Sequence, residues 1–145
     1  MVERGVRFVQ LYHSTWDDHS NLNANLKTNC DMTDLPAAGL ITDLAQRGLL
    51  EDTLVVWGGN WGDTDARDPG TSGRAVRPDH HRFAFSMLFY GGGFRGGTVI
   101  GQTDELGYHP TEDAIHAHDL QATMLHCLGF DHELLTYRHQ GVTSG

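Results

Sequence analysis

The chain has 145 residues, the length of one domain, and folding alone it would remove roughly 68% of its unfolded surface from water. Hydrophobic residues make up 39% and charged residues 20%, a composition that argues against collagen, a coiled coil and simple disorder. Its 19 acidic residues against 10 basic ones give a net charge of -9, which repels a nucleic-acid backbone and attracts metal cations.

Local composition disfavours several further classes of protein. Cys30 and Cys127 stand far apart and outside any CxxC spacing, so we expect neither a disulfide scaffold nor a cysteine zinc site. No apolar run approaches the roughly 18 to 20 residues of a membrane span, and residues 1–5 lack the apolar core of a signal peptide. We therefore expect neither a nucleic acid nor a membrane as a partner.

The first third of the chain predicts a strand, a loop and a helix. Residues 7–13 are β-branched and aromatic enough for a strand, and the polar stretch 14–25 indicates a loop. Asp34 is placed to cap a helix that has Pro36 in its first turn, and Gly48 is placed to end it.

The rest of the chain predicts short apolar strands and a second helix. The continuous apolar run 53–57 is typical of a strand buried on both faces of a parallel sheet, and 83–90 predicts another strand. Between them, residues 58–82 show no periodicity, as in long excursions kept for function. A glycine-rich turn at 91–97 and a helix over 119–128, closed by the next glycine, complete an α/β pattern.

Histidine is unusually frequent, with ten copies, and several stand beside carboxylates. The resulting clusters lie at residues 17–19, 79–81, 116–119 and 131–133. Because predicted loops and strand ends carry them, they can converge at the carboxyl edge of a sheet, where open α/β folds place ligands. Mixed oxygen and nitrogen ligands suit Zn, Mn, Fe and similar ions, so the sequence predicts a metal site.

The two earlier clusters each have a plainer explanation. Asp17 and His19 fit a solvated loop with a capping carboxylate as well as they fit a metal site. Asp79, His80 and His81 reach one site if an irregular loop rotates successive side chains, and two metals can then share Asp79 and His80. The alternative is a polar loop that leads into the following strand.

The later histidines are more ambiguous. His116 and His118 precede the second helix, where Asp119 is a candidate N-cap, and we expect one imidazole to be structural. The glycine run 91–97 matches neither a P-loop nor GxGxxG, which favours a turn, and neither cysteine has the basic neighbours of a nucleophile. A surface or hydrogen-bonded role is expected for His13, His109, His126, His132 and His139.

Several blocks of the chain resemble one protein family. They are GVRFVQLYHSTWDDHSN, RGLLEDTLVVWGG, DHH, GGGFRGGTVIGQTDELGY, HAHDLQATMLHCLG and DHELLTYRHQG. Together they resemble the C-terminal half of DUF1501 proteins, a sulfatase-like family of the alkaline phosphatase superfamily. The resemblance covers residues 1–145 as a single domain.

This resemblance implies a partial alkaline phosphatase-like α/β/α fold, with a mainly parallel sheet sandwiched by helices. It also implies two metal positions at the strand ends, holding divalent ions such as Zn, Mn or Ca. In the superfamily the ligands arrive as an Asp with a nearby His, an acidic-His pair and a late His. The resemblance thus assigns metal binding to Asp17, His19, Asp79, His80 and His118. The substitutes are His81 and His116.

Two features depart from the family pattern. Where the family commonly has Gly-Glu-Phe-Gly-Arg-Thr-Pro, residues 59–65 are Gly-Asn-Trp-Gly-Asp-Thr-Asp. An anionic ester would therefore meet Asp63 instead of arginine, whereas Asn60 could ligate a hard cation. No nucleophile-bearing strand precedes Val6, so we expect a fragment or a minimal version of the parent. A sheet cut this way exposes an edge, which favours homo-oligomers through that edge.

The leading expectation is a metal-dependent hydrolase-like domain that acts on small anionic sulfate or phosphate esters. Its nucleophile would be a metal-bound water or come from elsewhere. The alternative is a catalytically inactive metal-binding or interaction domain, and a third reading is mononuclear iron or zinc chemistry with one carboxylate and two histidines. The resemblance implies an exported bacterial parent, although this chain carries no twin-arginine signal.

Overall fold

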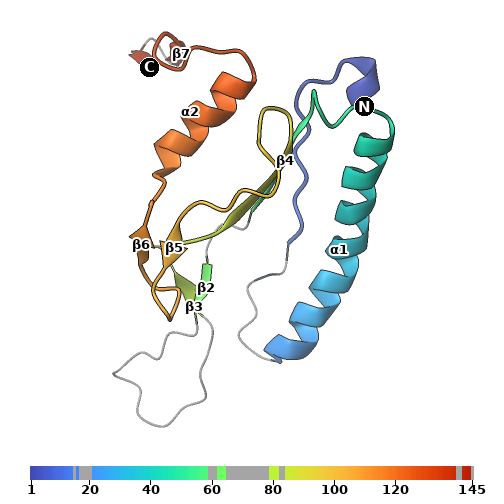
Figure 1. Ribbon diagram of the computed structural model, residues 1–145, viewed down its shortest axis with the longest axis vertical. Helices are drawn as coiled ribbons and strands as arrows, with labels where there is room; N and C mark the ends of the chain where they lie inside the picture. Colours follow the sequence, from blue (N-terminus) through green and yellow to red (C-terminus); the bar gives the residue numbers. More distant parts are fainter. Residues whose placement is uncertain are drawn as a thin grey trace. The chain divides into compact units, whose positions relative to one another are not determined.

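The computed structural model describes residues 1–14, 16, 21–58, 62–64, 79–81, 84–139 and 142–144 (Figure 1). The chain divides into two compact units, Met1–Thr42 and Asp43–Gly145. Its helices are η1 Val2–Arg4, α1 Leu22–Gln46 and α2 Ala117–Cys127. Its strands are β1 Leu54–Gly58, β2 Gly62–Thr64, β3 Asp79–His81, β4 Met87–Gly91, β5 Gln102–Thr103, β6 Pro110–Glu112, β7 Tyr137–His139 and β8 Val142–Ser144. No helix in the described ranges is long and apolar enough to cross a membrane.

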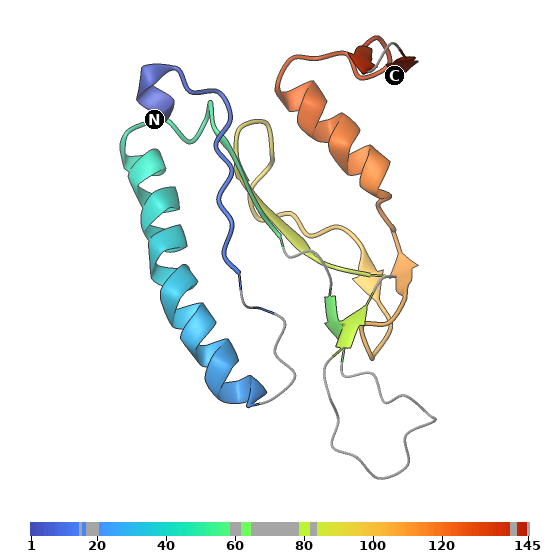
Figure 2. The same ribbon diagram turned by 180° about the vertical axis from the view of Figure 1, so that it is seen from behind.

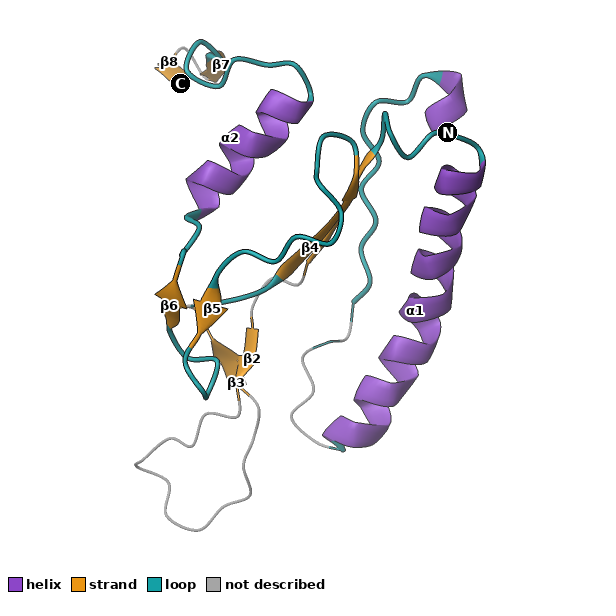
Figure 3. Ribbon diagram, in the orientation of Figure 1, coloured by secondary structure: helices purple, strands orange, loops and turns teal. Residues whose placement is uncertain are grey.

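The strands pair two by two, and every pair in the described part of the chain is antiparallel (Figure 3). The pairs are β1 with β4, β2 with β3, β5 with β6, and β7 with β8. The expected mainly parallel sheet sandwiched by helices, the partial α/β/α fold, is therefore wrong.

The order of the strands explains this difference. β2 and β3 lie between β1 and β4 in the chain, so the two pairs are nested and the chain doubles back on itself (Figure 2). A parallel pair would need a crossover, usually a helix, and the described residues between β1 and β4 contain none. Both strands were recognised from their apolar residues, but the direction of pairing was not.

The β1–β4 pair has a regular register but is only partly covered. Val55 lies opposite Tyr90 and Val56 opposite Phe89, and the Phe89 ring stacks on Phe94 with centroids 4.6 Å apart. Val56 is 38% exposed and Leu88 on β4 is 53% exposed. The expectation that this strand is buried on both faces is therefore wrong, because a two-stranded pair has too few neighbours to cover it.

A tight glycine turn follows β4 and lies against the residues that precede β1. The Gly92 N–H donates to the carbonyls of Leu50 and Thr53, at 3.0 and 3.1 Å. Gly91 has φ 75°, and a Cβ there would lie 2.2 Å from the Leu50 carbonyl oxygen. A side chain at Gly93 would meet the Cys127 Sγ at 2.9 Å. The prediction of a glycine-rich turn is confirmed, and close backbone approach is the reason for glycine at Gly91 and Gly92.

Helix α1 begins at Leu22, so the predicted helix start at Asp34 is wrong, as is the loop prediction for residues 22–25. Asp34 and Pro36 both lie inside the helix. An interior proline lacks the N–H for one helical bond and costs about 3 kcal/mol. Because of this cost, a proline usually predicts the first turn of a helix. In α1, however, the helix continues on both sides of Pro36.

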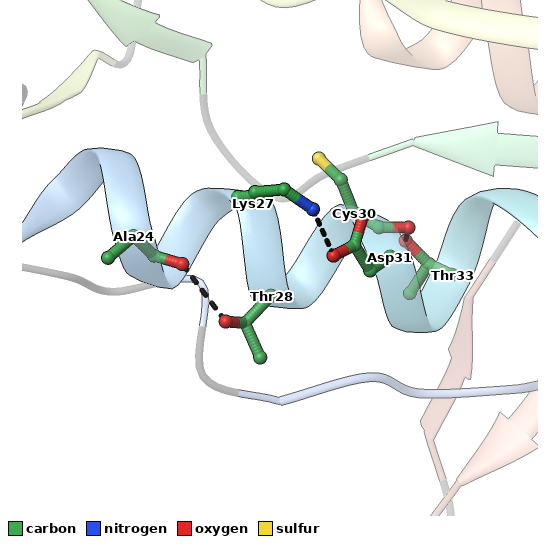
Figure 4. A network of polar contacts seen from close by, with 6 residues as sticks. All are labelled: Ala24, Lys27, Thr28, Cys30, Asp31 and Thr33. Carbon is green, nitrogen blue, oxygen red and sulfur yellow. Dashed lines mark hydrogen bonds and ion pairs between the residues drawn. The ribbon is translucent and has the colours of Figure 1, made fainter.

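The early turns of α1 accommodate their polar residues locally (Figure 4). The Thr28 hydroxyl donates to the Ala24 carbonyl at 3.0 Å, one turn earlier. Lys27 pairs with Asp31 at i, i+4 spacing on the exposed surface, a contact that contributes about 0.3–0.5 kcal/mol. These contacts satisfy polar groups that otherwise favour non-helical structure.

The segment before α1 is extended, but residues 7–13 form no strand, so that prediction is wrong. It runs beside α1 in both views (Figures 1 and 2). The His13 Nε2 lies 3.1 Å from the Asn29 Oδ1, and Asn29 is 5% exposed. The expected hydrogen-bonded role of His13 is confirmed. Phe8 and Tyr12 remain exposed, because no described strand pairs with this segment.

Both α-helices end at a glycine with positive φ, as predicted for Gly48 and for Gly129. After α1, the Leu49 N–H bonds to the Leu44 carbonyl at 2.9 Å and the Gly48 N–H to Ala45 at 3.1 Å. After α2, Phe130 bonds in the same way to Leu125, at 2.9 Å. These are Schellman motifs, which satisfy the last carbonyls of each helix.

The glycine turn gives a test of the β1–β4 closure. We expect Gly91→Ala to lower the free energy of unfolding by about 2–3 kcal/mol, because it combines a positive φ with a clash against a backbone carbonyl. Gly96→Ala is the control, since nothing lies within 4 Å of its added Cβ. Urea unfolding followed by circular dichroism measures both, and equal stabilities would contradict the turn geometry.

Candidate functional site

The first predicted ligand pair, Asp17 and His19, lies outside the described residues. The second pair lies on β3, of which the structure describes the backbone. The irregular loop predicted for Asp79, His80 and His81 is wrong, because these residues form a strand hydrogen-bonded to β2. Because both Asp79 and His81 pair with β2, successive residues of this segment alternate between the two faces of the ribbon, as in any strand, and do not turn irregularly as in a loop.

The register of the β2–β3 ribbon decides which residues are neighbours. Asp63 lies opposite His80, Thr64 opposite Asp79, and Gly62 opposite His81. Sequence reasoning considered Asp63 only as a departure from the family pattern. Its place beside His80 depends on a pairing between two segments that stand fourteen residues apart in the chain. No local sequence signal specifies that pairing.

The start of α2 separates the roles of His116 and His118. His116 is the N-cap: its Nδ1 accepts the His118 backbone N–H at 3.2 Å. The Asp119 Oδ2 accepts the His116 N–H at 3.2 Å. Asp119 is thus the third helical residue of a capping box, and the prediction that it is the N-cap is wrong. The imidazole of His116, three residues before Asp119, caps the helix instead.

The cap occupies the Nδ1 lone pair of His116. An imidazole nitrogen that accepts a hydrogen bond carries no proton, so in the neutral ring the proton is on Nε2. A capped His116 therefore has neither nitrogen available as a metal ligand. The His118 ring is exposed, lies edge-on 4.7 Å from the His116 ring and takes no part in the cap. Of these two alternatives, His118 is the one whose ring can bind a ligand.

Asp104 is a structured carboxylate that sequence reasoning did not single out. It lies between β5 and β6, and its Oδ1 accepts the Tyr108 N–H at 2.6 Å and the Leu106 N–H at 3.2 Å. Its Oδ2 accepts the His109 N–H at 3.0 Å. These donors, that of Tyr108 above all, hold the pKa of Asp104 below its ordinary value. The Asp-x-x-Gly spacing before the turn is the signal that could have found it.

No group of three His, Cys, Asp or Glu side chains converges among the side chains that the structure describes. The side chains of Asp79 and His80, and the segment that holds Asp17 and His19, lie outside that described set. The candidate set therefore consists of the β2–β3 ribbon, placed by its backbone, and His118 on α2.

A family model described as "Protein of unknown function (DUF1501)" matches residues 1–145. The chain belongs to the DUF1501 family. Comparisons with curated proteins and with solved structures found no match. The resemblance to DUF1501 inferred from the sequence is thus confirmed over the whole chain, while the relation of this DUF1501 chain to sulfatases stays a prediction.

The cap at α2 predicts opposite behaviour for two neighbouring histidines. We expect His116→Ala to lower the free energy of unfolding by about 1 kcal/mol, and His116→Asn, a good N-cap, to restore most of it. His118→Ala should change it by less than about 0.5 kcal/mol. Chemical denaturation compares the three variants, and a larger loss for His118→Ala than for His116→Ala would refute the cap assignment.

Asp104 predicts a pH dependence. Because its pKa is lowered in the folded chain, its stabilisation is complete above the ordinary aspartate pKa and is lost as the pH falls through the lowered value. An NMR titration of the Asp104 carboxyl carbon, with the Tyr108 and His109 amides as reporters, measures this. A pKa at or above that of an unstructured aspartate would contradict the loop geometry.

Proposed function

We propose that this DUF1501 chain binds divalent metal ions and contributes to the hydrolysis of sulfate or phosphate esters. The proposed ligands are Asp17, His19, Asp79, His80 and His118. The observation that carries the proposal is the strand β3, which holds a carboxylate and two imidazoles on hydrogen-bonded backbone. Successive strand residues belong to opposite faces, so β3 would offer Asp79 and His81 to one ion and His80 to another.

The mixture of donors supports Zn or Mn, with Ca as the hard-cation alternative. Imidazole nitrogen suits Zn and Mn, whereas Ca takes oxygen ligands. Such a cation polarises an ester oxygen and stabilises the negative charge that develops during displacement. The protein residues would hold the ion and orient the ester beside it.

The charge of the chain also supports a role for cations. Acidic residues outnumber basic ones by 19 to 10, so an anionic ester meets a repulsive average field. Asp63 and Asp79 add two carboxylates to the ribbon itself. A bound divalent ion would neutralise this charge locally and make the approach of an anionic substrate favourable.

The same carboxylates favour a second candidate function, cation binding without turnover. Asp63 lies on the ribbon at the position where an arginine would attract an anionic ester, as the sequence comparison with the family pattern indicates. A ribbon that binds a cation but repels the free ester would make a metal-binding or interaction domain.

Metal content tests the proposal. Plasma mass spectrometry on gel-filtered protein should find near-stoichiometric metal in the parent chain. The Asp79→Ala, His80→Ala double variant should lose it while keeping its circular dichroism spectrum. A matched control is the double variant Asp52→Ala, His132→Ala, which changes an exposed carboxylate and an exposed imidazole and should keep its metal.

Hydrolysis separates the two functions. We expect the metal-loaded chain to hydrolyse nitrophenyl sulfate or nitrophenyl phosphate, with the activity lost in the Asp79→Ala, His80→Ala variant. Metal binding without turnover would favour the binding domain. A parent chain that holds no metal after reconstitution with Zn²⁺, Mn²⁺ or Ca²⁺ would reject both functions.

A further inference from the structure

The β2–β3 ribbon brings together a carboxylate and an imidazole that are far apart in the sequence. Asp63 on β2 lies opposite His80 on β3, as the backbone register shows. From this juxtaposition we propose that Asp63 and His80 bind one divalent cation together, on the other face of the ribbon from Asp79 and His81. The inference rests on the proposed metal-binding function and assigns His80 a partner that the family resemblance does not.

Strand geometry sorts the residues into two sets. Successive residues of a strand belong to opposite faces, whereas directly opposite residues of a pair share one face. Asp63 and His80 therefore share one face. Asp79 and His81, two positions apart on β3, share the other with Thr64. Asp79 and His80, which are adjacent in the chain, do not share a face and are poorly placed to bind the same ion.

The spacing of a cross-strand pair suits a shared ion. Directly opposite residues have Cβ atoms about 4.5–5.5 Å apart. Metal bonds to imidazole nitrogen and carboxylate oxygen are about 2.0–2.2 Å long, so two donors on one ion lie within roughly 4.4 Å of each other. A directly opposite pair such as Asp63 and His80 is therefore compatible with one shared ion.

The donor pair also selects the ion. One nitrogen and one carboxylate favour Zn²⁺ over Ca²⁺, which prefers oxygen ligands throughout. Water molecules or ligands from elsewhere in the chain would complete the coordination. In the absence of metal the same two residues can form an ion pair between carboxylate and imidazolium, which is the competing explanation that an experiment must exclude.

Zn²⁺ titration of the full chain, followed by isothermal calorimetry, tests the inference. Asp63→Asn should weaken Zn²⁺ affinity at least 10-fold, and so should His80→Gln. Because both act on one ion, their effects should not add in the double variant. Asp79→Asn should instead change a separate binding step, because Asp79 lies on the opposite face of the ribbon from His80 and would hold a different ion. Asp52→Asn, an exposed carboxylate elsewhere in the same unit, should leave the affinity unchanged.

Co²⁺ absorption gives a second readout that an ion pair does not produce. The parent chain should show the visible bands of bound Co²⁺, and Asp63→Asn should change their position and intensity. An unchanged spectrum and affinity in Asp63→Asn, with both altered in His80→Gln, would overturn the shared site and leave the proposed function standing. A parent that binds neither Zn²⁺ nor Co²⁺ would overturn the proposed function itself. Circular dichroism verifies that each variant folds.

Discussion

The antiparallel pairing of β1 with β4 is the constraint on which the second unit of the chain depends. It brings Val55 beside Tyr90. It also returns the end of β4 to the residues before β1, where the Gly92 N–H donates to the carbonyls of Leu50 and Thr53. Since the pairs are nested, the same reversal carries β2 onto β3. A parallel arrangement would have separated these segments and left the histidines of β3 without a partner on β2.

Local hydrogen bonds stabilise the ends of the helices and strands, because few apolar side chains are buried. Leu44 is the only buried apolar side chain in the part of the chain that the structure describes, so hydrogen bonds at element ends carry much of the local order. Two Schellman motifs, the His116–Asp119 capping box and the Asp104 loop each satisfy backbone groups that a helix end or a turn leaves unpaired. The capping box and the Asp104 loop use His and Asp, which are also metal ligands. The contacts of each such residue therefore decide whether it has a structural role or can bind a metal.

Sequence reasoning succeeded where the signal is local. Apolar runs located β1 and β4, and Gly48 and Gly129 marked the helix ends because a positive φ favours glycine in any context. It failed where distant segments decide the outcome: strand direction and the neighbour of His80 depend on pairing. It also failed at Pro36, where a local penalty is absorbed within a longer helix. Of the candidate ligands, the β3 residues proved to lie on a strand, which changes the partners that each can have.

NMR on the uniformly labelled full chain can determine the register of the nested strand pairs. We expect cross-strand nuclear Overhauser contacts between the backbones of Val55 and Tyr90, and between those of Asp63 and His80. A slip of one residue would place Asp63 opposite Asp79 or His81 and exchange the faces of the ribbon. Contacts of that shifted kind would refute the register of the ribbon, and parallel-strand contacts from β1 would refute the antiparallel pairing of β1 with β4.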